Sequence, residues 1–135
     1  MNITTKNNLI TKAGHNHLTG EGAEKQGYFD VAVSRYYYAL FQKSLFILHL
    51  KPGYVEPGGD NSHNDMIEDL YQEVYPRLND EEVTWLAQFP KLKKRRRNAD
   101  YKLKMLTKND FNLCFKYEYK QIAELLDRII GGRAQ

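Results

Sequence analysis

Arginine, aspartate and tyrosine occur within two helical turns of one another in the segment Arg95–Tyr101, which reads RRRNADY. The wider run from Lys91 to Lys104 has eight lysines and arginines and one acid, so its net charge is +7. The net charge of the whole chain is +3, so the remaining residues carry −4. Such a concentration of cations attracts RNA, DNA or nucleotide phosphates through counterion release and bidentate guanidinium contacts. The same run is also typical of a solvated, positively charged helix end. Charge alone leaves both interpretations open.

A helix through this run would give the cations a common face. Lys93, Arg96, Arg97 and Asp100 would then lie within about a quarter turn of one another, with Arg96 and Asp100 at the i,i+4 spacing. Among so many cations Asp100 should stay ionised and orient a guanidinium rather than act as a base. The residues predicted to contact phosphate in this segment are Lys93, Arg95, Arg97 and Asn98.

Metal-independent RNA cleavage is one chemistry that these residue types support. It needs a base to activate the 2′-hydroxyl, a donor to the leaving oxygen and cations to stabilise the charged phosphorane. Arg96 and Arg97 would supply the cations, whereas Tyr101, with an ordinary pKa of about 10, is a poor base unless the arginines lower it. His63 is the better-tuned proton carrier if its helix lies beside the basic segment; otherwise it is a surface histidine near a helix N-terminus. The predicted catalytic set is Arg96, Asp100, Tyr101 and His63.

Length and composition indicate one folded domain spanning residues 1–135. Hydrophobic residues make up 41% of the chain and charged residues 27%, which is typical of a globular protein. The single cysteine, Cys114, allows no internal disulfide, and four histidines with one cysteine fit no zinc spacing, so we expect neither metal nor cofactor. The polar N-terminus and the short apolar stretch Leu45–Leu50 predict no signal peptide and no membrane association, and hence a cytoplasmic protein.

The hydrophobic periodicity predicts helices that must position these residues. A weak first helix over 9–23 contains three glycines, and a firm second helix covers 28–50 and is apolar over much of its circumference. Ser62 and Asp65 have the capping-box spacing for a helix over 62–74, and another helix starts near Asp80. Pro90 either kinks that helix or begins a new one. A last helix follows a cap at Thr107 and ends at the glycine pair 131–132, giving an all-α, up-and-down bundle of four to five helices.

Three landmarks occur in an order that is characteristic of one family. They are the helical segment Ser34–Phe41 (SRYYYALF), the pair Ser62-His63, and the segment Arg96–Tyr101 (RRNADY). The chain resembles the small prokaryotic HEPN (higher eukaryotes and prokaryotes nucleotide-binding) domains, over residues 28–127. The resemblance implies a HEPN-like helical bundle that forms homodimers and is often encoded beside a minimal nucleotidyltransferase in toxin–antitoxin or phage-defence pairs.

The resemblance also implies a chemistry. Many members look like metal-independent endoribonucleases whose site is an arginine followed by four to six residues and a histidine, assembled from both subunits. In this chain Tyr101 takes the histidine position, and no histidine follows His63. The resemblance places Arg35 near the motif, so we expect it to reach Asp100 and contact phosphate; the alternative is an exposed arginine whose stem covers a hydrophobic edge.

Three functions therefore remain open. The first is a HEPN-like RNA-directed toxin or phage-defence protein, acting as a homodimeric endoribonuclease. The second is a non-catalytic RNA- or nucleotide-binding partner of a minimal nucleotidyltransferase antitoxin, in which Tyr101 is the candidate acceptor for adenylylation. The third is a helical nucleic-acid-binding domain with no active site.

Overall fold

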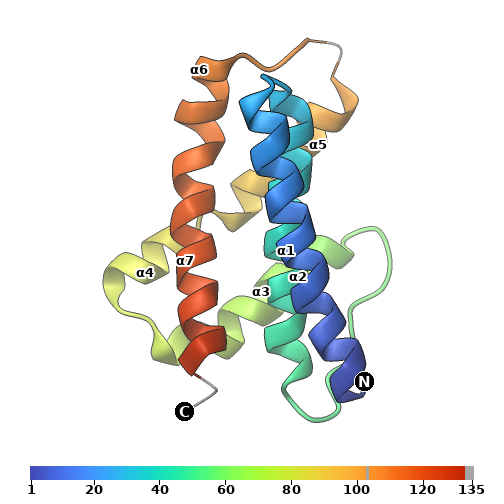
Figure 1. Ribbon diagram of the computed structural model, residues 1–135. Helices are drawn as coiled ribbons and strands as arrows, with labels where there is room; N and C mark the ends of the chain where they lie inside the picture. The colour runs from blue at the N-terminus through green and yellow to red at the C-terminus, as the bar shows by residue number, and fades with distance from the viewer. Residues whose placement is uncertain (103, 133–135) are drawn as a thin grey trace.

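The computed structural model describes residues 1–102 and 104–132, which are mostly helical and contain no strand, and this confirms the all-α prediction. Figure 1 shows the helices packed side by side as a bundle, with α1 and α2 running antiparallel to each other. The helices are α1 (Ile3–Lys25), α2 (Phe29–His49), α3 (Ser62–Val74), α4 (Asp80–Leu86), α5 (Phe89–Tyr101), α6 (Lys108–Phe111) and α7 (Tyr117–Gly132), with a 3-10 turn at Tyr75–Arg77 and a π-helical turn at Asn112–Lys116. None of the helices in the described ranges is both long and apolar enough to cross a membrane.

Helix α2 is the centre of the bundle. It contacts α1, α3, α5 and α7, and its buried residues include Tyr37, Leu40 and Leu48. This position explains the broad apolar surface of its sequence, since a helix surrounded by neighbours must be hydrophobic over most of its circumference.

Helix α1 is longer than the predicted range 9–23, and one of its glycines serves packing. A Cβ at Gly20 would lie 2.7 Å from ring carbons of Tyr36 on α2, so only glycine allows the two helices to approach this closely. The Tyr36 hydroxyl then donates to Glu24, one turn further along α1, at 2.8 Å. Tertiary contacts thus outweigh the weak helix propensity of the glycines.

The helix starts confirm most of the predicted boundaries. Helix α3 begins at Ser62 as expected, but the predicted capping box is wrong: no side chain caps this end, and the Asp65 amide bonds instead to the Asn61 carbonyl at 2.9 Å. The reciprocal capping box lies at α4, where Asn79 accepts from the Glu82 amide at 2.8 Å and Glu82 accepts from the Asn79 amide at 3.1 Å.

Two further boundaries concern the basic helix and its successor. Pro90 lies in the first turn of α5, so it begins a new helix rather than kinking the previous one. Thr107 accepts a hydrogen bond from the Asp110 amide at 3.1 Å, which confirms the predicted cap. From there the chain stays helical to Gly132, through both glycines that were expected to end it.

Candidate phosphate-binding site

A hollow of about 500 Å³ brings together the first turn of α3 and one face of α5. Its lining consists of Asp60, His63, Lys93, Arg96, Arg97 and Tyr101. We call this surface the His63–Arg96 hollow. The sequence alone could not show that the start of α3 lies beside the basic helix, and this adjacency was the condition for any role of His63.

Arg96 is the most firmly held cation of the hollow. Its guanidinium carbon lies 5.2 Å from the centre of the Tyr37 ring and 5.5 Å from that of Tyr38, within cation–π range. One terminal nitrogen, Nη1, donates to Asp100 at 3.2 Å, which confirms the predicted i,i+4 pair. The side chain is only 12% exposed, and its Nε is buried with no partner among the residues that the structure describes. A buried donor without an acceptor costs stability, and such a cost is common where a side chain serves a ligand.

His63 is held through one ring nitrogen and by stacking. Its Nδ1 lies 3.0 Å from the hydroxyl oxygen of Tyr37, and its ring stacks on Phe41 with 4.3 Å between centroids. Burial lowers the pKa of His63 below its ordinary value, and the charges of Arg96 and Lys93 lower it further. The imidazole is therefore neutral at pH 7, so the positive charge of the hollow comes from Lys93, Arg96 and Arg97.

Tyr101 differs from the other tyrosines near the hollow. Its side chain is 75% exposed, whereas Tyr37 is fully buried. An exposed phenol at the edge of a cationic hollow is accessible to a second macromolecule. Two of the three consecutive tyrosines of α2, Tyr36 and Tyr37, are buried in the core.

Arg35 does not make the contact that was predicted for it. It lines a shallower hollow together with Asp100, but its guanidinium donates to Asn16 of α1 at 3.3 Å, and the ion pair of Asp100 is made by Arg96. Asn16 also donates to Gln42 at 2.9 Å. Arg35 and Gln42, seven residues apart on α2, thus both pair with α1, because the Asn16 amide offers an acceptor and a donor.

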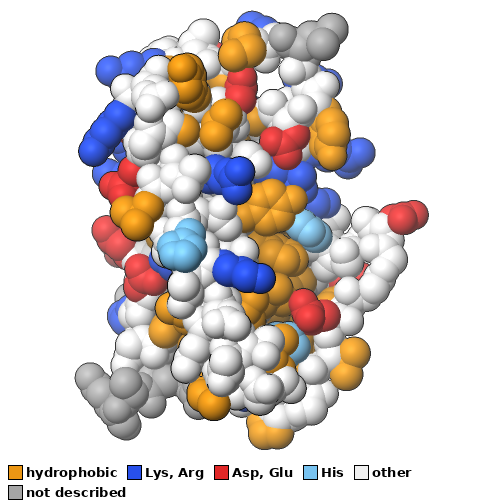
Figure 2. Space-filling view, turned by 45° about the vertical axis from the view of Figure 1, so that its right-hand side comes forward, with side chains coloured by type: hydrophobic (Ala, Val, Ile, Leu, Met, Phe, Trp, Pro, Cys, Tyr) orange, Lys and Arg blue, Asp and Glu red, His pale blue; other side chains and the backbone are white. Residues whose placement is uncertain are grey.

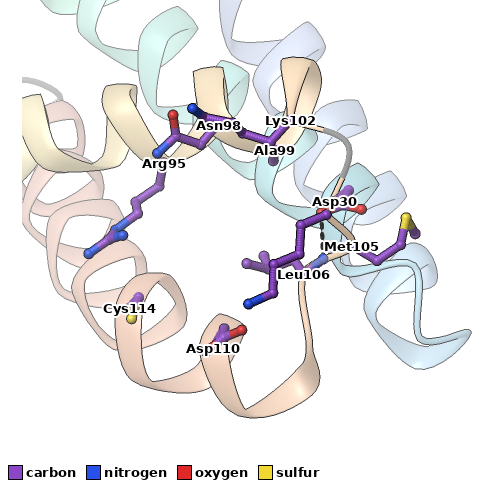
Figure 3. Close-up of a pocket in the computed structure, with 10 residues that line it drawn as sticks. Asp30, Arg95, Asn98, Ala99, Lys102, Met105, Leu106, Asp110 and Cys114 are labelled. Atoms are coloured by element: carbon purple, nitrogen blue, oxygen red, sulfur yellow. Dashed lines mark hydrogen bonds between the residues drawn. The ribbon is translucent and has the colours of Figure 1, made fainter.

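Arg95 and Asn98 lie on the opposite face of α5 from the His63–Arg96 hollow. They line a separate hollow of about 300 Å³ with Asp30, Leu106 and Cys114, shown in Figure 3. The Asp30 carboxylate accepts from the Leu106 amide there at 3.2 Å, which ties the connection after α5 to the start of α2. Since successive helical residues are separated by about 100°, one run of cations is divided between two faces. The predicted phosphate ligands therefore do not form one group.

Two residues of the site were missed in the sequence. Tyr37 supplies the partner of His63, and its position within the three tyrosines gave no sign of which one faces the histidine. Asp60 lines the hollow from the loop before α3, and the sequence of that loop has no pattern that could have placed it.

The two histidines of α1 lie elsewhere and have other contacts. His17 lies 2.7 Å from the Tyr119 hydroxyl through Nδ1 and 3.4 Å from Glu21 through Nε2, while His15 is exposed. His17 therefore connects α1 with α7. Among residues 1–102 and 104–132, no cluster of three or more histidine, cysteine and acidic side chains is arranged to hold a metal ion.

Comparisons of the chain with protein-family models, with curated protein sequences and with solved structures find no match. The geometry of the His63–Arg96 hollow and the motifs that supply its residues are therefore the basis for assigning a function.

Proposed function

We propose that this chain is a HEPN-like toxin or phage-defence protein that acts on RNA in the cytoplasm, and that the His63–Arg96 hollow holds a phosphate group of the RNA backbone. The observation that carries the proposal is the convergence of His63 with Arg96, from separate helices, in one hollow that Lys93 and Arg97 also line. A phosphodiester offers anionic oxygens and no donors, which matches a lining of ammonium, guanidinium and imidazole groups.

Preorganisation supports this assignment for Arg96 in particular. The two tyrosine rings and Asp100 hold its guanidinium in one orientation before any ligand arrives. Less side-chain entropy is then lost on binding than for a free surface arginine. Arg96 should therefore contribute more to binding than its charge alone.

A binding measurement on matched variants tests this proposal. Fluorescence anisotropy with a labelled single-stranded RNA would compare the wild type with Arg96→Ala and Lys94→Ala, which remove the same charge from the same helix. Lys94 is exposed and is not part of the hollow's lining. We expect roughly a 10- to 100-fold loss for Arg96→Ala, as for a charge-assisted hydrogen bond, and less than about threefold for Lys94→Ala. Equal losses in the two variants would contradict a specific site.

Metal-independent strand cleavage is a second candidate function, favoured by the presence of arginines and a neutral histidine in one hollow. Arg96 and Lys93 would stabilise the extra charge of the phosphorane as it develops. Incubation of pure protein with end-labelled RNA, with and without a chelator, tests for it. If the protein cleaves RNA, we expect products that form in the presence of chelator and are absent with Arg96→Ala. If RNA is bound but no products form, the protein binds RNA without cleaving it.

The exposure of Tyr101 favours a partner enzyme. We propose that a minimal nucleotidyltransferase acts as the antitoxin. It would transfer a nucleoside monophosphate from a nucleoside triphosphate to this hydroxyl, with loss of the phenolic proton and release of pyrophosphate, which would place phosphate charge at the hollow and block RNA. Tyr117, 65% exposed and outside the hollow, is the internal control. Mass spectrometry after co-expression should find the added mass on Tyr101 alone, and an unmodified Tyr101 would exclude this step.

A homodimer is the proposed assembly, because apolar surface lies beside the hollow. Tyr38 and Phe41 of α2 are only partly buried, and Figure 2 shows hydrophobic side chains gathered in the middle of one face, next to histidines and between lysine and arginine side chains. A patch of this kind is typical of protein interfaces. Sedimentation velocity should show a dimer that Phe41→Glu dissociates, whereas a monomeric wild type would contradict this assembly.

A further inference from the structure

The hydroxyl of Tyr37 has one partner and no access to water. The residue is 0% exposed, and Nδ1 of His63, 3.0 Å away, is the one hydrogen-bond partner of its hydroxyl in the described part of the chain. A buried O–H that donates to nothing carries a desolvation cost. If Nδ1 carried the proton, the Tyr37 oxygen would accept it and its own hydrogen would have no acceptor. The O–H must therefore donate, and Nδ1 must accept.

We propose that Tyr37 fixes His63 in the neutral tautomer with its proton on Nε2, so that His63 presents a hydrogen-bond donor, and not a base, to an ionised phosphate oxygen in the hollow. The near-parallel rings, 12° apart, keep the two residues in this relation. Burial also raises the pKa of Tyr37, which keeps its hydroxyl protonated and able to donate. The choice of phosphate as the ligand rests on the proposed function, whereas the tautomer follows from Tyr37 and His63 alone.

This tautomer changes what the hollow can bind. Lys93, Arg96 and Arg97 offer donors and no acceptors, and His63 with Nε2–H does the same. The acceptors in the lining belong to Asp60 and Tyr101, which are both exposed. The inner surface thus favours a group that accepts only, such as a fully ionised phosphodiester or phosphate monoester.

The Nε2–H tautomer also changes the role that His63 is expected to have in RNA cleavage. A base for the 2′-hydroxyl would need a free lone pair on Nε2, and that position carries hydrogen in this tautomer. Tyr37 is therefore a positioning residue, acting through His63. Protonation of Nδ1 would break its hydrogen bond from Tyr37, in agreement with the neutral imidazole of the free protein.

Nitrogen NMR on the free protein reads the tautomer directly. Long-range ¹H–¹⁵N correlation of ring-labelled histidines at pH 7 should show a protonated Nε2 and an unprotonated, hydrogen-bonded Nδ1 for His63, with the signals identified by their loss in His63→Gln. Tyr37→Phe should convert this pattern to a mixture of tautomers. A proton on Nδ1 in the wild type, or an unchanged pattern in Tyr37→Phe, would overturn the inference. These NMR measurements need no RNA, so they test the tautomer independently of the proposed phosphate site.

Binding by conservative variants supplies the second test. Glutamine carries an N–H group near the place of Nε2, so His63→Gln should bind inorganic phosphate and single-stranded RNA within about threefold of the wild type, while His63→Leu should lose about tenfold. If Tyr37→Phe leaves the tautomers equally populated, affinity should fall about twofold. Equal losses for glutamine and leucine would refute the donor role. If the wild type binds neither phosphate nor RNA while NMR shows a proton on Nε2 of His63, the proposed phosphate site is contradicted. The assignment of the tautomer is then still supported.

Discussion

Replacing Arg96 by methionine separates the contribution of the guanidinium to the fold from its contribution to a ligand. The substitution removes the cation–π contacts with Tyr37 and Tyr38, about 1–2 kcal/mol at this exposure. It also removes the i,i+4 ion pair with Asp100, about 0.3–0.5 kcal/mol. In return it eliminates the buried Nε without a partner, about 1–3 kcal/mol, and adds a thioether against two aromatic rings, about 0.3–1.5 kcal/mol. The opposing contributions nearly cancel.

We therefore expect the free energy of unfolding of Arg96→Met to lie within about 1 kcal/mol of the wild type, with RNA affinity reduced as in Arg96→Ala. Urea denaturation followed by circular dichroism gives the first quantity, and anisotropy gives the second. The contrary result is a free energy of unfolding that falls by more than about 3 kcal/mol, with a lower urea midpoint and an unchanged m-value. That result would show that the main role of Arg96 is to stabilise the fold. The argument for a ligand-directed arginine would then be wrong.

Two further variants test the packing and the titration described above. Gly20→Ala should destabilise the protein by about 1–3 kcal/mol, because its Cβ would meet the Tyr36 ring, whereas Gly14→Ala, which meets nothing within 4 Å, should stabilise α1 by about 0.5–1 kcal/mol in the same urea experiment. The lowered pKa of His63 means that the unfolded chain binds a proton more readily, so stability should fall as the pH drops below the ordinary value of 6.5 and towards the folded-state pKa. His63→Gln should lose this part of the pH dependence, and a profile identical to that of the wild type between pH 5 and 7 would contradict the assignment.

Hydrophobic periodicity was sufficient to predict the fold class and most helix boundaries. Val33, Tyr36 and Leu40, spaced at three- and four-residue steps, are all buried in α2. The first helix was predicted to be weak because intrinsic propensity treats Gly20 as a defect, whereas the effect of this glycine depends on Tyr36, a residue on the next helix. The cap of α3 was misplaced for a similar reason: the spacing of two side chains does not determine the backbone conformation of the residue before them.

The site was predictable only where its contacts are local. The Arg96–Asp100 pair follows from helical spacing, and the structure contains it. The contact between His63 and Tyr37 joins α3 to α2, and no periodicity in either helix specifies it. Arg35 was predicted to reach Asp100, but its hydrogen-bond partner is Asn16 of a neighbouring helix, which the sequence could not indicate either.

The basic run is divided between two faces of α5, and this predicts how strongly RNA affinity depends on salt concentration. Three cations, Lys93, Arg96 and Arg97, line the His63–Arg96 hollow, while eight lie in the whole run from Lys91 to Lys104. For single strands, the logarithm of the affinity falls with the logarithm of salt concentration by about 0.7 per neutralised phosphate. One hollow contacting up to three phosphates predicts a slope of no more than about −2, whereas the whole run acting as a polycation predicts about −5 to −6. Anisotropy titrations between 50 and 300 mM salt distinguish the two values, and a slope near the larger one would show that charge, and not the geometry around Arg96, determines RNA binding.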